Sequence, residues 1–365
     1  MNRKSNLNTL VLGLEHFIDK IGYQACEYMK NGVSVKYLVS DKSNTSAFYA
    51  KKYAADVEVL PQSKVLIFIS CFFKMLKLKL EYVELYDTGN MFIVYILISF
   101  ILRRKVIVIY RGGELQKHQR RKFSLNYMKH FIATKVASKI VVKEKNIIEE
   151  YKKNNFPLSK MYYLYNCVPL LPVTEFKENR TIDLLFLNSI RKNRNVPFLI
   201  DVIAKLYKEK PDINVVIAGF NSLDDESLSF ELEEEQRILN TIKEKKLESV
   251  IKVHGFVKNP NEYHLNSKIF VFPADIVFAN YSLLESMGCG CVPIVANGEG
   301  SNLIVTQEEG SIIELDIDKW AAMIIQYINS PSLLQKKSLQ SRNKIEFKFS
   351  MQSWFKRMMA LRQEE

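Results

Sequence analysis

Apolar residues follow two alternating patterns along the chain. Short continuous apolar runs, typical of buried strands, are each followed by a segment in which apolar positions recur every three or four residues, typical of helices. In the first half, the expected strands are Thr9–Leu14, Val33–Ser40, Tyr82–Tyr86, Val106–Tyr110 and Ile140–Val142. The expected helices are Ile21–Asn31, Lys64–Leu78, Met91–Leu102, Leu125–Ala137 and Glu144–Lys153. This alternation predicts right-handed crossovers and a parallel sheet.

The alternation stops at Leu170–Asn179, which contains Pro172 and mixed charge, and then starts again. In the second half, the expected strands are Asp183–Leu187, Asn214–Ala218, Ile251–His254, Ser267–Phe272 and Val292–Ala296. The expected helices are Val196–Lys208, Leu232–Lys246, Ser282–Met287, Lys319–Asn329, Pro331–Asn343 and Met351–Arg362. We therefore place a domain linker at the interruption.

The two series of elements predict two doubly wound, Rossmann-like α/β domains that face a central cleft. The expected domains are residues 1–169 and 170–347, and a last helix within 348–365 is expected to return to the first domain. In such sheets a ligand binds at the carboxyl ends of the strands. No Gly-x-Gly-x-x-Gly follows an expected strand and no phosphate-loop lysine motif is present, which removes the usual support for redox or ATP-hydrolysing chemistry.

Composition indicates a globular protein without a metal or disulfide framework. Hydrophobic residues make up 47% of the chain and charged residues 25%. The five cysteines and five histidines are scattered without metal-ligand spacing, so no metal is expected and a reducing, cytoplasmic compartment is favoured. The apolar runs Leu10–Leu14 and Met91–Leu102 are too short for a signal peptide and a membrane span, respectively.

The excess of positive over negative charge is confined to the first half. Residues 1–169 carry 28 Lys and Arg against 13 Asp and Glu, whereas residues 170–365 carry 24 against 27. Lys64–Leu80 and Lys117–Lys139 mix lysine and arginine with aromatic residues, a pattern typical of helices that bind anionic membranes. Ordinary solvated helix faces explain each stretch equally well. Nucleic acid is not expected as a partner, because no nucleic-acid motif accompanies the charge.

The segment Asn280–Gly288 carries the most specific chemical signal. It opens a helix directly after a buried strand and a short loop, so its unpaired N–H groups suit a phosphate, and Glu285 lies one turn inside. A purely structural alternative also exists. Ser282 and Glu285 have the spacing of a capping box, in which the two side chains satisfy the N–H groups of the helix start.

This segment resembles the donor-binding motif of retaining glycosyltransferases of family 4, which have the GT-B fold. That motif holds a nucleotide sugar with two Glu residues separated by seven positions. Glu285 matches the second Glu, which binds the ribose, while Val277 stands at the position of the first. The resemblance extends over nearly the whole chain, through Arg111–Leu115, Asn166–Pro169 and Leu185–Phe198.

The resemblance implies a role for individual residues. Arg194 and Arg191 would stabilise the charge that grows on the departing diphosphate, without a metal or other cofactor. The remaining donor-binding residues would be Gly219 and Phe256 at the base, Asn280, Tyr281 and Ser282 at the sugar and phosphates, and Glu285 at the ribose. On the acceptor side, Arg111 and Glu114 would act in catalysis, and His16 would assist Arg111 in binding.

These observations predict an enzyme that transfers a sugar from a nucleotide-diphosphate sugar to a lipid-linked or glycan acceptor in cell-surface polysaccharide or lipopolysaccharide synthesis. It would be cytoplasmic and peripheral on the inner face of the membrane. Two alternatives share the architecture. A nucleotide-sugar epimerase would need more carboxylates and histidines in the cleft, and a non-catalytic binding protein would be consistent with Val277 in place of the first Glu.

Overall fold

The computed structural model describes residues 8–41, 44–86, 91–111, 125–172 and 179–364. The chain forms two compact units. Unit 1 comprises Met1–Tyr165 and Met351–Glu365, and unit 2 comprises Asn166–Ser350. The chain therefore enters unit 2 at Asn166 and comes back to unit 1 at Met351, close to the boundaries expected at 169/170 and 347/348.

Unit 1 is built on a seven-stranded parallel sheet with the order β3-β2-β1-β4-β5-β6-β7. The strands are β1 Asn8–Leu14, β2 Ser34–Val39, β3 Asp56–Val59, β4 Tyr82–Tyr86, β5 Lys105–Tyr110, β6 Lys139–Val142 and β7 Met161–Tyr163. The strand order changes direction between β1 and β4. In a doubly wound sheet, this is the point at which the loops on the two sides diverge and leave room for a ligand.

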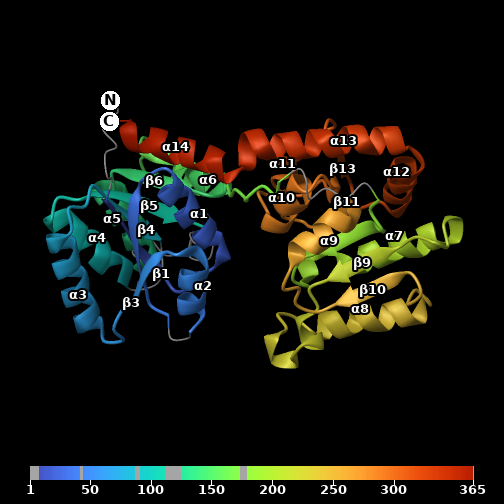
Figure 1. Ribbon diagram of the computed structural model, residues 1–365, viewed down its shortest axis with the longest axis horizontal. Helices are drawn as coiled ribbons and strands as arrows, with labels where there is room; N and C mark the ends of the chain where they lie inside the picture. The colour runs from blue at the N-terminus through green and yellow to red at the C-terminus, as the bar shows by residue number, and fades with distance from the viewer. Residues whose placement is uncertain (1–7, 42–43, 87–90, 112–124, 173–178, 365) are drawn as a thin grey trace. The chain divides into compact units, whose positions relative to one another are not determined.

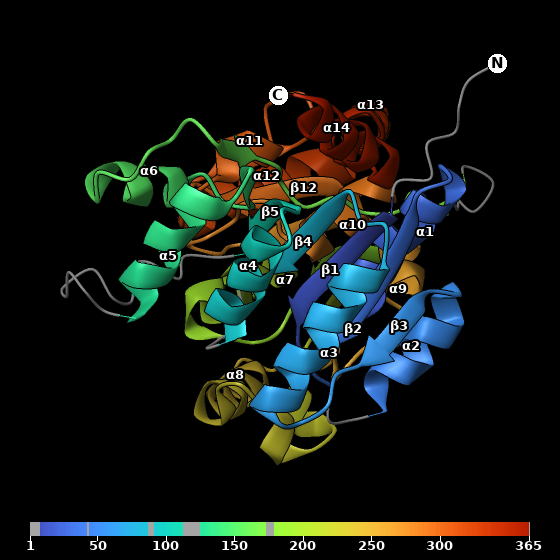
Figure 2. The ribbon, with the colours of Figure 1, turned by 90° about the vertical axis from the view of Figure 1, so that its left-hand side faces the viewer.

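Helices cover both faces of this sheet. They are α1 Asp19–Lys30, α2 Thr45–Tyr53, α3 Lys64–Lys77, α4 Phe92–Ile101, α5 Leu125–Val136, α6 Asn146–Lys153 and the C-terminal α14 Met351–Gln363. Helices α3, α4 and α5 lie side by side on one face (Figure 2), whereas α1 packs against both α2 and α14 on the other. Right-handed crossovers require this division, because the chain winds first from β1 to β3 and then from β4 to β7.

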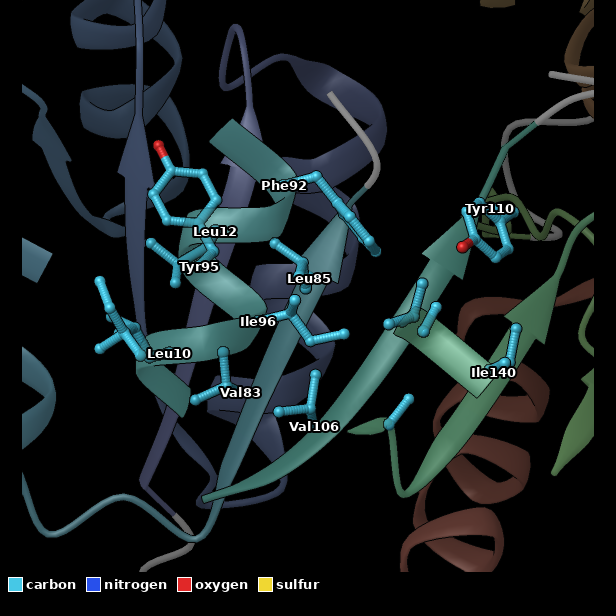
Figure 3. Packing of buried hydrophobic residues seen from close by; sticks show 14 of the residues in the cluster. Leu10, Leu12, Val83, Leu85, Phe92, Tyr95, Ile96, Val106, Tyr110 and Ile140 are labelled. Carbon is cyan, nitrogen blue, oxygen red and sulfur yellow. The ribbon is translucent and has the colours of Figure 1, made fainter. Parts of the chain in front are cut away.

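The core of unit 1 lies between the sheet and the α3–α5 layer (Figure 3). Leu12 of β1, Leu85 of β4 and Val106 of β5 pack with Phe92 and Ile96 of α4, and all five side chains are fully buried. Burying an aliphatic or aromatic side chain of this size stabilises the fold by about 1.5–3 kcal/mol. This packing therefore fixes the strands β1 and β5, which precede the predicted acceptor-side residues His16 and Arg111.

The last helix is tied to unit 1 by a buried ion pair. The Arg362 guanidinium in α14 pairs with Glu84 of β4 and also donates to Thr9 Oγ1 (3.0 Å) and to Tyr28 Oη (2.9 Å). The Tyr82 hydroxyl donates to the Arg362 carbonyl. The expected return of a C-terminal helix to the first domain thus has a specific polar anchor.

Unit 2 is built on a six-stranded parallel sheet with the order β10-β9-β8-β11-β12-β13. Figure 1 labels β9, β10, β11 and β13 of this sheet. The strands are β8 Ile182–Leu187, β9 Val215–Ala218, β10 Ile251–His254, β11 Ser267–Phe272, β12 Val292–Ala296 and β13 Ser311–Ile313. The helices are α7 Val196–Glu209, α8 Leu232–Glu244, α9 Pro260–Asn266, α10 Tyr281–Gly288, α11 Ser301–Ile304, α12 Ile317–Asn329 and α13 Pro331–Lys344. Here the order changes direction between β8 and β11.

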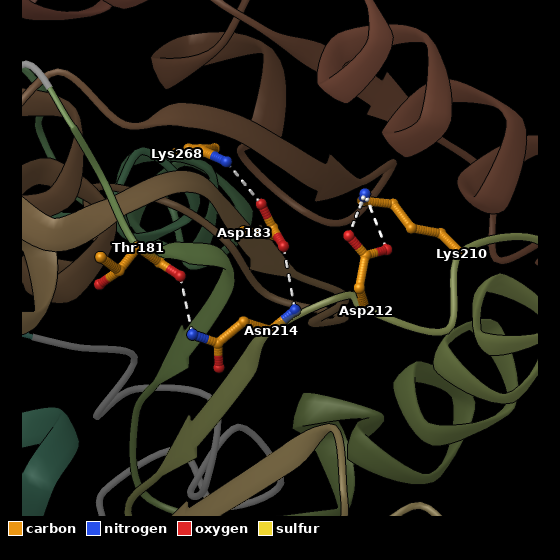
Figure 4. A network of polar contacts seen from close by, with 6 residues as sticks. All are labelled: Thr181, Asp183, Lys210, Asp212, Asn214 and Lys268. Atoms are coloured by element: carbon orange, nitrogen blue, oxygen red, sulfur yellow. Dashed lines mark hydrogen bonds and ion pairs between the residues drawn. The ribbon is translucent and has the colours of Figure 1, made fainter.

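A polar network aligns three strands of unit 2 at their amino ends (Figure 4). The Asp183 carboxylate in β8 accepts from Lys268 Nζ in β11 (2.7 Å) and from the backbone N–H of Asn214 just before β9 (2.9 Å). The Asn214 side chain donates to the Thr181 carbonyl (2.7 Å). Because these contacts fix the register of the strands, the opposite, carboxyl ends lie at a common edge.

The structure confirms the predicted class, two parallel-sheet Rossmann-like α/β domains, and adds short elements that were not expected: α2, β3, β7, α9, α11 and β13. Each is short or polar. Strand β3 has no buried residue, and α9 buries only His264 and Leu265 of its seven residues. Such segments lack the apolar periodicity on which the prediction rests.

Candidate functional site

The carboxyl ends of the unit 2 strands bring the predicted donor-side residues to one edge of the sheet. Arg191 and Arg194 follow β8, Gly219 follows β9 and Phe256 follows β10. Asn280 opens α10, which follows β11. Residues that are up to 90 positions apart in the sequence therefore share the edge at which a doubly wound sheet binds its ligand.

Gly219 permits a close approach between β9 and the loop after β8. Its φ is +121°, and a Cβ atom at this position would lie 1.9 Å from the Asn188 carbonyl oxygen. Only glycine fits there without moving the backbone. The Gly219 N–H donates to the His254 carbonyl (3.0 Å), which holds the end of β9 against the end of β10. Gly219 thus shapes the site, and its predicted contact with the base remains a prediction.

The start of α10 is held by an asparagine pair that sequence reasoning did not anticipate. Asn280 is the N-cap residue, and its Oδ1 accepts from the Leu283 N–H (3.4 Å) and from Asn188 Nδ2 (3.2 Å). Asn166 donates to the Ala279 carbonyl (3.0 Å) and accepts from the Tyr281 hydroxyl (3.2 Å). The loop before α10 is consequently fixed on both sides, which orients the first N–H groups of the helix.

The capping-box interpretation of Ser282 and Glu285 is wrong. Because α10 begins at Tyr281 with Asn280 as its cap, Ser282 is the second residue of the helix and Glu285 the fifth. Reciprocal capping requires the hydroxyl at the N-cap position and the carboxylate at the third helical position. Glu285 is therefore not part of a capping box at the start of α10.

Glu285 faces a buried histidine. One carboxylate oxygen of Glu285 lies 3.9 Å from Nε2 of His264 in α9, and His264 is completely buried. Burial lowers the pKa of His264 to about 3, so the imidazole is neutral near pH 7 and the contact is not an ion pair. The Glu285 side chain itself remains partly exposed, at 24%. No sequence motif marks His264, because this contact depends on the packing of α9 against α10.

Arg194 is held close to the loop that precedes α10. It ends a 3-10 turn, Lys192–Arg194; its Nη1 donates to the Ile276 carbonyl (3.1 Å), and its guanidinium lies 5.1 Å from the centre of the Phe272 ring. Burial, followed by the proximity of Arg191, lowers the pKa of Arg194, but an arginine stays charged near pH 7. Arg191 is exposed and stacks on Phe230, with its guanidinium 4.3 Å from the ring centre.

The position of the missing first Glu is part of the packed interior. Val277 is buried, and its N–H donates to the Glu299 carbonyl (2.9 Å). An aliphatic side chain offers no acceptor for a sugar hydroxyl, so recognition by a carboxylate at this position is lost. Phe256, in contrast, is 70% exposed after β10, where its ring presents a flat apolar surface.

The predicted acceptor-side residues lie at the carboxyl edge of the unit 1 sheet. His16 follows β1, and its Nδ1 is 3.0 Å from Asp41 Oδ1, a partner that sequence reasoning missed. Arg111 follows β5, and its guanidinium lies 5.6 Å from the centre of the Tyr86 ring. Both residues thus have a defined neighbour at this edge. Glu114 lies outside the described residues.

The described part of the chain offers neither a metal site of clustered side chains nor a membrane-spanning helix. Within it, no group of three or more His, Cys, Asp or Glu side chains is placed to hold a metal ion. No helix there is both long and apolar enough to cross a membrane.

Comparison with known proteins identifies the second unit. Residues 172–344 match the family model described as Glycosyl transferases group 1. Unit 2 is a group 1 glycosyltransferase domain. The matched segment contains the donor-side residues from Arg191 to Glu285. The resemblance to glycosyltransferases is thereby confirmed.

Two curated relatives are similar to part of the chain. One is the N-acetylgalactosamine-N,N'-diacetylbacillosaminyl-diphospho-undecaprenol 4-alpha-N-acetylgalactosaminyltransferase of Campylobacter jejuni, 30% identical over 173 residues, or 44% of this chain. The other is the capsular polysaccharide biosynthesis glycosyltransferase CapH of Staphylococcus aureus, 24% identical over 169 residues, or 46% of this chain. The chain spans less than half the length of these relatives, 43% and 45%.

Solved structures match the fold over nearly the whole chain. Alr3699/HepE of Anabaena, solved in complex with UDP, has a TM-score of 0.77 at 12% identity, covering 97% of this chain and 98% of that one. A glycosyltransferase from Rickettsia africae has a TM-score of 0.74 at 13% identity, covering 98% of both chains. The group 1 domain and unit 1 together thus have the fold of these two-domain, GT-B glycosyltransferases.

Proposed function

We propose that this protein transfers a sugar from a nucleotide-diphosphate sugar to a lipid-linked or glycan acceptor in cell-surface polysaccharide synthesis. The observation that carries the proposal is the start of α10 in a group 1 domain, where an asparagine-capped helix end and Glu285 share one sheet edge with Arg194. The two curated relatives support it, because their names assign them to an undecaprenol-linked acceptor and to capsular polysaccharide.

The proposed donor contacts follow from the chemistry of each group. The N–H groups at Asn280, Tyr281 and Ser282 point along the helix axis toward its start, where the positive end of the dipole favours a phosphate or a sugar hydroxyl. The Glu285 carboxylate accepts hydrogen bonds from the ribose hydroxyls. In addition, the exposed ring of Phe256 and the backbone at the end of β9, at Gly219, contact the base.

Arg194 is the proposed stabiliser of the leaving group. When the sugar–phosphate bond breaks, negative charge grows on the diphosphate, and a fixed cation that contacts it lowers the barrier. Arg194 is suited to this role because its guanidinium is half-buried and anchored at the Ile276 carbonyl, so little reorganisation is needed. Arg191 adds a second, exposed positive charge. Retention of configuration and independence of a metal or other cofactor are part of the proposal.

Replacing Arg194 tests this role. Arg194→Ala should lower kcat more than it weakens binding of the nucleoside diphosphate, since the leaving-group charge is greatest in the transition state. The measurements are turnover with the donor in excess and calorimetric binding of the diphosphate product. Equal losses in both would reduce Arg194 to a binding residue, and Lys208→Ala, at the far end of α7, is the matched control.

The acceptor-side roles fall to unit 1. Arg111 is proposed to bind the acceptor and to assist the departing phosphate, with Glu114 orienting the acceptor hydroxyl and His16 completing the contact. A lipid-linked acceptor would be met on the cytoplasmic side of an anionic membrane, where the protein would be peripheral. The excess of lysine and arginine in residues 1–169 supports such a location.

Radiolabelled nucleotide sugars and a membrane extract test the function. Transfer of label into the lipid or polysaccharide fraction is the expected outcome. Conversion of the free nucleotide sugar into its epimer would instead support the epimerase alternative, and donor binding without any turnover would support a non-catalytic protein. The matched control is a variant with both Arg194 and Glu285 replaced by alanine, which should transfer no label.

A further inference from the structure

Helix α3 exposes an apolar face in addition to the one that it buries. Its inner face, Ile67, Cys71 and Met75, is buried against the unit 1 core. Its outer residues Leu66, Ile69, Phe73 and Leu76 follow the spacing of a single helix face and are 43–53% exposed. A helix that is apolar on both sides is normally buried on both sides, so this outer face indicates a further contact.

The neighbouring helices continue this surface. Helix α4 has no charged residue, and Phe100 and Ile101 at its end are 62% and 64% exposed. Arg104, just after α4, donates to the Met75 and Leu78 carbonyls, so the end of α4 lies beside the end of α3. Helix α5 follows α4 in the same layer (Figure 2) and exposes Phe131. We call the exposed apolar residues of α3 and α4 the outer face of unit 1.

The helices that form the outer face carry positive charge only. Helices α3, α4 and α5 contain no Asp or Glu. Lys64 at the start of α3 is exposed, as are Lys77, Lys79 and Arg103 beside the ends of α3 and α4. Lys74 differs, because it pairs with Glu58 of β3. Apolar side chains bordered by exposed cations, which outnumber the neighbouring Glu58 and Glu81, complement a surface that is apolar inside and anionic at its edge.

The lengths of α3 and α4 indicate whether they would span a bilayer or lie in its interface. Helix α3 has 14 residues and α4 has 10, whereas spanning a bilayer takes roughly 20 apolar residues. The helices therefore suit a position in the interface, with the apolar side chains in the acyl region and the cations at the headgroups.

We propose that the outer face of unit 1 inserts into the surface of an anionic bilayer by its apolar side chains and not by charge alone. This proposal rests on the proposed function in one respect: the bilayer is taken to be the membrane that contains the lipid-linked acceptor. The cations draw the protein to the surface, and Leu66, Phe73 and Leu76 hold it there. Because salt screens charges but does not weaken apolar burial, most of the bound protein should stay on the vesicles near molar salt.

Vesicle binding by the full chain tests the inference. The triple variant Leu66→Gln, Phe73→Gln, Leu76→Gln removes the apolar side chains and keeps helix-forming residues. We expect its affinity for vesicles containing phosphatidylglycerol to fall at least tenfold, with an unchanged melting temperature. The matched control, Leu223→Gln, Leu228→Gln, Leu339→Gln, changes residues of unit 2 that are 50–61% exposed and should bind like the wild type.

A tryptophan placed on the outer face reports insertion directly, so the result does not depend on whether the triple variant folds like the wild type. Phe73→Trp should show a blue-shifted emission on adding vesicles, while the two native tryptophans, Trp320 and Trp354, are buried and should not respond. Unchanged vesicle affinity of the triple variant, or complete release of the wild type near molar salt, would overturn the proposal. A concentration-dependent dimer that the triple variant lacks, without vesicle binding, would assign the face to a second copy of the chain.

Measuring donor binding without lipid distinguishes failure of the membrane proposal from failure of the proposed function. In the absence of lipid, a nucleoside diphosphate should raise the melting temperature of the wild type and of the triple variant equally. Loss of this shift in both proteins would contradict the proposed function and leave the vesicle result standing. The reverse result, a normal shift with no vesicle binding, would reject insertion alone.

Discussion

At the scale of single residues, the proposed donor site depends most on the carboxylate of Glu285. It is the fifth residue of α10, outside the cap, and partly exposed beside a neutral histidine. Its position therefore has no explanation in the stability of the helix start. A role in accepting hydrogen bonds from a ligand accounts for a carboxylate there.

Glu285→Gln should weaken binding of a nucleoside diphosphate about tenfold or more, because a hydrogen bond to a charged acceptor contributes about 1.5–3 kcal/mol. The melting temperature should change little, since Asn280 and not Glu285 caps the helix. Calorimetric titration of the ligand and thermal unfolding measure the two effects. Glu308→Gln, at an exposed position after α11, is the control, and equal affinities of the two variants would refute the assigned role.

His264 makes the free energy of unfolding of unit 2 depend on pH. Its pKa is lowered to about 3 by burial, whereas the unfolded chain titrates at about 6.5. Between these values the unfolded state binds the extra proton, so the free energy of unfolding falls as pH falls, by about 1.4 kcal/mol per pH unit. Above about pH 6.5 the group has no effect.

Replacing the histidine with glutamine should remove that slope. The measurement is urea unfolding of wild type and His264→Gln between pH 4 and pH 8, followed by the fluorescence of Trp320 in α12 with Trp354→Phe as background. Glutamine keeps a donor near the Glu285 carboxylate, which separates the titration from the loss of a polar group. Parallel pH profiles of the two proteins would show that His264 is not the group responsible.

At the scale of elements, the chain's helices and strands differ in how far the sequence determines them. Strands such as Tyr82–Tyr86 and Val292–Ala296 were predicted to the residue, because the first ends before Asp87 and the second before Asn297. The start of α10 was not, since Asn280 and Ser282 are both good N-cap residues and only the tertiary partner Asn188 distinguishes them. Likewise, the pairs His16–Asp41 and His264–Glu285 depend on packing between elements, so no pattern in the local sequence indicates them.

Helix α14 shows how one buried pair fixes a whole element. Arg362→Met should lower the stability of unit 1 by about 3–5 kcal/mol, because it leaves Glu84 buried without its cation. The fluorescence of Trp354 in α14 follows unfolding of this unit. Lys356→Met, at an exposed position of the same helix, should have little effect. Adding Glu84→Leu to Arg362→Met should recover much of the loss, and no recovery would show that packing, not the unpaired charge, is responsible.

At the scale of the whole molecule, the chain makes two units with separate cores and different charge. The basic first half forms the sheet that carries Arg111 and His16, and the group 1 domain carries the donor-side residues. This division was predictable, since the strand–helix alternation stops and restarts near Pro172. The outer face of unit 1 was only partly predictable, because Lys64–Leu80 reads as basic and aromatic, whereas the structure assigns Lys74 to Glu58 and turns Phe73 outward.

Because the chain forms two units, we can predict which of them a nucleoside diphosphate stabilises against unfolding. A ligand that binds only the folded group 1 domain stabilises it by about 2.7 kcal/mol when its concentration is one hundred times its dissociation constant. In a panel of nucleoside diphosphates, we expect at least one to raise the unfolding midpoint reported by Trp320 more than that reported by Trp354, each read with the other tryptophan replaced by phenylalanine. At the same ligand concentration, a tenfold weaker affinity of the Glu285→Gln variant would reduce this stabilisation to about 1.4 kcal/mol, so its shift should be about half as large. A shift confined to Trp354 would move the donor site to unit 1, and no shift with any diphosphate would leave the proposed function without its donor.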